Sequence, residues 1–189
     1  MQEGQVTLSG AALALPEYFT VMATMNPYDG VGTYTLPLAT YDRFGYSYEF
    51  EYPNIEKESA ILAGAHTDYP SEPVIKRADI GALRKKVLTI HVEDKITTYV
   101  ATLLASLRAS NDLASGVSVR AGLAIIAGGR ARALLRGRDF VLPEDIEALW
   151  IPTLRHRLEL SYTAESRGVT RASILMETLG RNPTPDASA

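Results

Sequence analysis

The chain has 189 residues, 46% hydrophobic and 22% charged, which is the composition of an ordinary globular protein long enough to bury a core. Its formal net charge of −3 argues against general binding to nucleic acid. The absence of cysteine excludes disulfides and thiolate metal sites and is compatible with a reducing cytoplasm. No apolar stretch reaches the length of about 18 residues that a membrane span needs, so we expect none.

The first elements along the chain are strands. Residues 5–8 and 11–15 flank Ser9-Gly10 and predict a β-hairpin, because glycine takes positive φ at little cost. The apolar run 19–24 ends at a polar turn signal and predicts a strand buried on both faces. Residues 45–52 alternate aromatic and polar side chains and predict a half-buried strand.

From residue 55 onward the pattern is helical. A three-and-four apolar spacing is most regular over 93–110, where Ile96, Tyr99, Val100, Leu103, Leu104 and Leu107 should face the core. Over 119–136 we expect Leu123, Ile126, Leu134 and Leu135 to point inward and Gly137 to end the helix. Further helices are predicted over 55–65, 79–86 with Asp79 as its cap, 143–158 with a kink or break at Pro152, and 171–179. Residues 87–92 should be extended and 160–170 loose.

This change in pattern sets the expected domains. Residues 1–53 should form a sheet-rich part, 54–183 an all-helical domain, and 184–189 a disordered tail.

Asn26 directly follows the predicted buried strand, where ligands of open α/β sheets usually lie. A carboxamide there can orient a water and contact a terminal phosphate. The alternative is a local turn before Pro27, which is a common role for asparagine.

Arg43 lies between Asp42 and Phe44 in a short aromatic segment. It can form a surface ion pair with Asp42, which would contribute little stability. It can also reach across a subunit boundary and neutralise charge on a transferring phosphoryl group.

Arg120 falls in the first turn of the helix that Ser118 is expected to cap. A helix N-terminus with an arginine forms an anion site. The alternative is a solvated arginine on a helix that also carries Arg130, Arg132 and Arg136.

Other chemistry has little support in the sequence. The three histidines, at positions 66, 91 and 156, have no partner at metal-ligand spacing, so no metal site is predicted. The sequence has no G-x-x-x-x-G-K-[ST] phosphate loop and no apolar strand ending in an Asp-Glu pair to hold Mg²⁺. Without these parts, phosphoryl transfer lacks its main electrostatic components.

Several of these segments together resemble the MoxR group of AAA+ ATPases. The matching runs are Ala-Thr-Met-Asn-Pro at 23–27, Gly-Thr-Tyr-Thr-Leu-Pro at 32–37, Asp-Arg-Phe at 42–44 and Gly-Val-Ser-Val-Arg-Ala at 116–121. In that family Asn26 would be the first nucleotide sensor, Arg43 the arginine finger and Arg120 the second sensor in a helical lid. Departures are Leu38 and Thr40, where the family often has Glu and Gln, and Val119 in place of proline.

The resemblance implies an α/β fold class: a remnant of the AAA+ parallel-sheet core with a β-hairpin, followed by an all-helical lid domain. It implies ATP and Mg²⁺ as cofactors, a hexameric ring, and a cytoplasmic ATPase that remodels a partner, often one with a von Willebrand A-type domain. The resemblance covers the C-terminal half to two thirds of the family's domain, and the phosphate loop and metal-binding acids precede this part.

We therefore expect the chain to supply the two sensors and the finger but to hydrolyse ATP negligibly by itself, as a truncated module would. The alternative function is a non-enzymatic helical module that binds a partner protein. A helical nucleic-acid binder fits poorly with the net charge.

Overall fold

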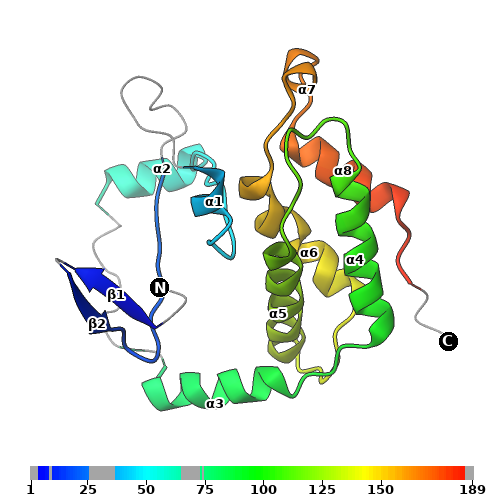
Figure 1. Ribbon diagram of the computed structural model, residues 1–189. Coiled ribbons are helices and arrows are strands. Elements are labelled where there is room, and N and C mark those ends of the chain that lie inside the picture. The colour runs from blue at the N-terminus through cyan, green and yellow to red at the C-terminus, as the bar shows by residue number, and fades with distance from the viewer. Residues whose placement is uncertain (1–3, 9, 26–36, 65–72, 74, 186–189) are drawn as a thin grey trace. The chain divides into compact units, whose positions relative to one another are not determined.

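The computed structural model describes residues 4–8, 10–25, 37–64, 73 and 75–185. The chain divides into two compact units, Met1–Thr35 and Leu36–Ala189. The first unit contains the predicted hairpin, in which β1 (Gln5–Leu8) pairs antiparallel with β2 (Ala11–Ala14) (Figure 1). Gly10 has a φ of 84°, the left-handed conformation that the two-residue turn requires.

The two other predicted strands are wrong. Over the described part of 19–24 there is no strand, and Met22 is 92% exposed. Over 45–52 the chain is irregular and Phe50 is 97% exposed. A strand needs a neighbour to satisfy its backbone groups, and the only sheet among the described residues is the hairpin, so these segments have no edge to pair with.

The second unit is helical. Its helices are α1 (Leu38–Tyr41), α2 (Ile55–Leu62), α3 (Arg77–Leu88), α4 (Asp94–Arg108), α5 (Val119–Leu135), α6 (Pro143–Leu154), the 3₁₀ helix η1 (Arg155–Arg157), α7 (Tyr162–Ser166) and α8 (Arg171–Arg181). Helices α4, α5, α6 and α8 pack together in the bundle on the right of Figure 1. No described helix is long and apolar enough to cross a membrane.

The core of the bundle confirms the predicted inward face of α4. All six of its predicted residues are buried: Ile96, Tyr99, Val100, Leu103, Leu104 and Leu107. Trp150 of α6 is fully buried, and its indole N–H donates to the carbonyl of Leu175 in α8 at 3.0 Å. Burial of this large side chain with its one polar atom satisfied ties α6 to α8.

The predicted inward face of α5 is wrong for two of its four residues. Leu123 is 67% and Leu135 84% exposed, whereas Ile126 and Leu134 are partly buried at the edge of the core. The buried residues of α5 are Ala121, Gly122, Ile125, Gly129 and Ala133. A Cβ on Gly122 would lie 3.0 Å from Leu104 Cδ1, so α5 packs through a face of small residues that lets its neighbours approach closely.

Three other helical predictions need correction. Asp79 is the third residue of α3, and its carboxylate accepts the Lys76 N–H at 3.1 Å from inside the helix. Helix α3 continues to Leu88, so 87–92 is not extended throughout. Pro152 lies inside α6 without dividing it, and the helix ends two residues later in η1.

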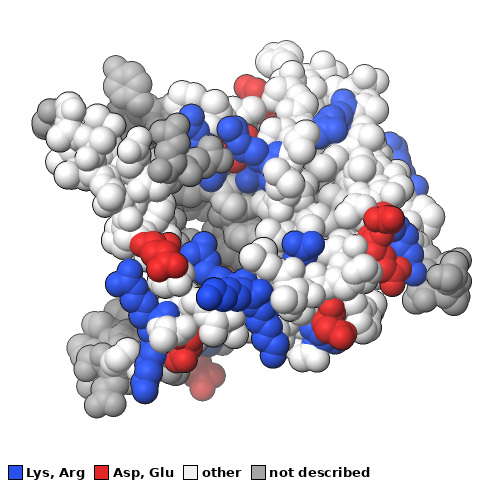
Figure 2. All heavy atoms as spheres, turned by 60° about the horizontal axis from the view of Figure 1, so that its bottom comes forward, with Lys and Arg blue, Asp and Glu red and all other residues white. Residues whose placement is uncertain are grey.

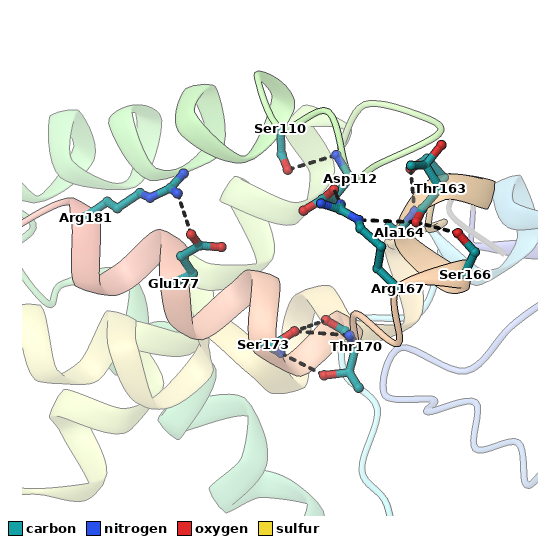
Figure 3. A network of polar contacts seen from close by, with 11 residues as sticks. Ser110, Asp112, Thr163, Ala164, Ser166, Arg167, Thr170, Ser173, Glu177 and Arg181 are labelled. Atoms are coloured by element: carbon teal, nitrogen blue, oxygen red, sulfur yellow. Dashed lines mark hydrogen bonds and ion pairs between the residues drawn. The ribbon is translucent and has the colours of Figure 1, made fainter.

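The segment predicted to be loose, 160–170, contains α7. Its N-cap is Ser161, whose hydroxyl accepts the Ala164 N–H at 3.3 Å. An ion pair joins Arg167, just after α7, to Asp112 in the loop after α4 (Figure 3). The Ser161 N–H also donates to the Asp112 carbonyl at 2.8 Å. These bonds fix α7 against the end of the bundle.

Candidate functional site

The three residues predicted from the sequence have different outcomes. Asn26 lies outside the described residues. Arg43 and Arg120 are both described and belong to the second unit. The side chain of Asp42, the neighbour of Arg43, lies against the start of α5, where Arg120 is located.

Asp42 is the centre of this site. Helix α1 ends at Tyr41, and the next turn points the Asp42 carboxylate at α5. Its Oδ1 accepts the Ser118 hydroxyl at 2.7 Å, and its Oδ2 lies 3.3 Å from the Arg120 guanidinium. Oδ1 also lies 3.3 Å from Nε of Arg157, within ion-pair distance but not aligned as a hydrogen bond. One carboxylate thus gathers a hydroxyl and two guanidinium groups.

Arg157 anchors the backbone of the same segment. Its side chain is 3% exposed, and it donates to the carbonyls of Thr153 at 3.1 Å, Asp42 at 3.1 Å and Phe44 at 2.7 Å. Burial lowers the pKa of Arg157 and the Asp42 carboxylate opposes this shift, but an arginine remains charged at any ordinary pH. Arg157 of η1 therefore packs the backbone of residues 42–44 against the end of α6.

His156 makes a further contact with this segment. Its Nε2 lies 3.0 Å from the Phe44 carbonyl, which can only accept, so Nε2 carries a proton and donates. Burial lowers the pKa of His156, with the hydrogen bond to Phe44 opposing this effect. The imidazole is therefore neutral at pH 7, and its buried Nδ1 has no partner among the described residues.

A fourth contact lies one turn further along α5. The Tyr46 hydroxyl donates to the Ala124 carbonyl at 3.0 Å. It passes over Gly128, where an added Cβ would lie 2.3 Å from the Tyr46 oxygen. Glycine at this position is therefore needed for the tyrosine to reach α5.

Arg43 takes no part in this network. Its side chain is exposed and makes no hydrogen bond or ion pair within the part of the chain that the structure describes. The alternative of a surface pair with Asp42 is wrong, because Asp42 pairs instead with Arg120 and Arg157. Arg43 is thus an accessible cation on a segment that Asp42 and Arg157 hold in place.

The surroundings of Arg120 suit an anion. Ser118 is the N-cap of α5, Arg120 lies in the first turn with its side chain 50% exposed, and that turn contains no acidic residue. The Ser118 hydroxyl makes no capping bond, and it donates its proton to Asp42. The carboxylate of Asp42 stands where a phosphate oxygen could be held by the same two donors.

The described side chains give no support for a metal site. Among the described residues, no group of three or more His, Asp or Glu side chains could hold a metal ion.

The roles of the Asp42 carboxylate and the Ser118 hydroxyl were not predicted from the sequence. The Asp-Arg-Phe run pointed to the right segment, but the partners of Asp42 lie 76 or more residues away along the chain.

Two family models match the chain. Residues 1–46 match the ATPase family associated with various cellular activities (AAA), and residues 105–178 match the AAA lid domain. The second match covers α5 to α7 and parts of α4 and α8. The matches therefore include both the Asp42 segment and the start of α5.

Named relatives point to the same group. The chain is 33% identical to chaperone MoxR1 of Mycobacterium tuberculosis over 100% of this chain and 53% of that protein. It is 28% identical to protein MoxR of Paracoccus denitrificans over 79% of this chain and 51% of that protein. It is 35% identical to the uncharacterized protein YeaC of Bacillus subtilis over 98% of this chain and 59% of that protein.

A solved structure agrees with the fold. The crystal structure of a candidate ATPase from Cytophaga hutchinsonii superposes with a TM-score of 0.88 and 27% identity, over 98% of this chain and 60% of that one. This confirms the predicted fold class, an AAA+ core remnant followed by a helical lid. The chain spans only about half to three fifths of the length of these relatives. Together, the family models, the relatives and the fold show that the chain belongs to the MoxR-type AAA+ ATPases.

Proposed function

We propose that the chain supplies the sensor and lid part of an ATP site in a MoxR-type AAA+ module. The observation that carries this proposal is the convergence of Ser118, Arg120 and the Asp-Arg-Phe segment at the start of α5. In the proposal Arg120 contacts the terminal phosphate of ATP, and Asn26 acts as the first sensor. ATP, when bound, supplies the phosphoryl group.

Arg43 has a different role in the proposal. Its exposed guanidinium is free of partners within the described residues, so it can reach the nucleotide of a neighbouring subunit in a ring and stabilise charge there. We further propose that such a ring, which AAA+ proteins generally form, is hexameric and cytoplasmic and remodels a partner protein, for example one with a von Willebrand A-type domain. Mg²⁺ would be held by residues other than those described here.

The test is the melting temperature of the chain with and without ATP. One arginine and one hydroxyl give weak binding, with a Kd on the order of 1 mM. At about 10 mM ATP this would stabilise the fold by about 1.4 kcal/mol and raise the melting temperature by about 3–5 °C. Arg120→Ala should abolish the shift. The control is Arg136→Ala, which removes another exposed arginine directly after α5 and should leave the shift intact.

The Arg43→Ala variant distinguishes ATP binding by the same chain from the action of Arg43 on the nucleotide of a neighbouring subunit. Arg43→Ala should leave the ATP-dependent shift unchanged, because the proposed finger serves the next subunit's nucleotide. The chain alone should hydrolyse ATP negligibly, since its sequence has no phosphate loop. Turnover by the purified chain that Arg43→Ala abolishes would contradict this expectation.

The second candidate is a non-enzymatic module that binds a partner protein. Exposed apolar side chains on α2 favour it, since Ile55 is 87% and Leu62 82% exposed. An absence of any ATP-dependent shift in the wild-type chain would support this candidate against the nucleotide site.

A further inference from the structure

The Asp42 carboxylate occupies the donors that the proposed function assigns to a phosphate. Ser118 donates to it at 2.7 Å and Arg120 lies 3.3 Å away, both at the start of α5. The Ser118 O–H and the Arg120 Nη1 N–H that now donate to the two Asp42 oxygens cannot donate to a phosphate at the same time. Binding of a terminal phosphate by this pair of donors, the Ser118 hydroxyl and Arg120 Nη1, therefore requires Asp42 to give up these contacts.

The two sides of Asp42 are held with different strength. On the Arg157 side, a guanidinium that is 3% exposed holds the backbone carbonyls of Asp42 and Phe44. On the α5 side, the Arg120 side chain is 50% exposed, and exposed ion pairs are weak because water screens them. A phosphate carries more charge than a carboxylate and can compete for that side.

Arg43 follows Asp42 directly, so its position depends on where Asp42 is held. Among the described residues, the Asp42 carboxylate makes the hydrogen bonds and the ion pair that join the 42–44 segment to the start of α5. Loss of the Asp42–α5 contact would leave this segment held by Arg157 alone, so the stretch from which the exposed Arg43 side chain projects could adjust relative to α5.

We propose that Asp42 is a positioning residue that competes with the terminal phosphate for Ser118 and Arg120, so that occupancy of one subunit's site moves its own Arg43. This proposal rests on the proposed function, because it takes Arg120 as the phosphate contact. It adds a link within one subunit between the lid arginine and the finger.

The competition is tested with inorganic triphosphate by titration calorimetry. Asp42→Asn keeps the shape of the side chain and removes its charge, so triphosphate should bind about fivefold more tightly, as expected for loss of a weak competing ion pair. The matched control is Glu49→Gln, which makes the same charge change in the same stretch, where Glu49 pairs with Arg155. Its affinity should equal that of the wild type.

The outcomes separate the two proposals. Equal affinity of the wild type and Arg120→Ala for triphosphate would overturn the proposed function. Arg120-dependent binding that Asp42→Asn leaves unchanged or weakens would overturn the competition alone. An equal gain from Glu49→Gln would also overturn it, since the gain would then be a general effect of charge.

The movement is tested by a distance measurement, which the absence of natural cysteine makes simple. Spin labels at Ala39→Cys in α1 and Ala127→Cys in α5, both exposed positions, report the separation of the two helices. Saturating triphosphate should shift the distance distribution, and Asp42→Asn should shift it without triphosphate. An unchanged distribution with triphosphate bound would overturn the link to Arg43.

Discussion

Gly128 of α5 should be needed for Tyr46 to bond to the lid. A Cβ there would lie 2.3 Å from the Tyr46 hydroxyl oxygen and 2.8 Å from Leu149 Cδ1, both closer than any side chain tolerates. Both atoms are at the ends of side chains, so Gly128→Ala should displace them rather than distort the helix. Tyr46 would then lose its 3.0 Å bond to the Ala124 carbonyl.

The magnitude follows from three terms. Alanine in a helix interior stabilises by about 1 kcal/mol relative to glycine. Loss of the tyrosine hydrogen bond costs about 1 kcal/mol, and repacking around Leu149 costs about 1–3 kcal/mol. We expect a net loss of about 1–3 kcal/mol in the free energy of unfolding. Urea unfolding followed by the fluorescence of Trp150, the single tryptophan of the chain, measures it.

Two further variants test whether the close contact with Tyr46 causes the loss of stability. Gly180→Ala in α8 is the matched control, because a Cβ there meets nothing within 4 Å, and it should stabilise slightly. In a Tyr46→Phe background the closest clash is gone, so Gly128→Ala should cost about 1 kcal/mol less. The reasoning is refuted if Gly128→Ala stabilises as Gly180→Ala does, or if its cost is the same in both backgrounds.

Two other predictions concern buried polar groups of the lid. Asp145 is 1% exposed and accepts two bonds from Arg138, at 2.8 and 2.9 Å, so Asp145→Ala should cost about 2–4 kcal/mol in urea unfolding; a loss below about 0.5 kcal/mol would contradict it. Burial lowers the pKa of His156, so below about pH 6.5 the unfolded chain binds a proton that the folded chain does not, and stability should fall. His156→Gln can still donate to Phe44 and should lessen this loss between pH 7.5 and 5.5; an identical pH dependence would contradict it.

The sequence predicted elements best where large side chains alone define the packing. Helix α4 has six large buried residues at regular spacing, and all six were predicted. Helix α5 packs through Gly122, Gly129 and small neighbours, so a prediction from its large side chains included the exposed Leu123 and Leu135. Small residues bury little area themselves, and their role becomes visible only with the partner helix in place.

The strands failed for a different reason. An apolar run such as 19–24 has strand character in isolation, but a strand exists only when another chain segment pairs with it. The hairpin was predictable because both of its strands and the turn at Gly10 are adjacent in sequence.

The candidate site was predicted in part. The resemblance located Arg43 and Arg120, but Asp42 was considered only as a partner for Arg43. Its contacts with Ser118 and Arg157 join segments 76 and 115 residues apart, and no local pattern indicates such pairing. The roles proposed for Asn26, Arg43 and Arg120 stay predictions.

The contact between Arg120 and the terminal phosphate of ATP is the central claim, and phosphorus NMR tests it most directly. The three phosphates of ATP give separate resonances, so a titration with the chain identifies which one is contacted. We predict that the γ-phosphate resonance shifts most, and that Arg120→Ala removes this shift while Arg136→Ala does not. A γ-phosphate shift that persists in Arg120→Ala, or its absence in the wild-type chain, would contradict the account.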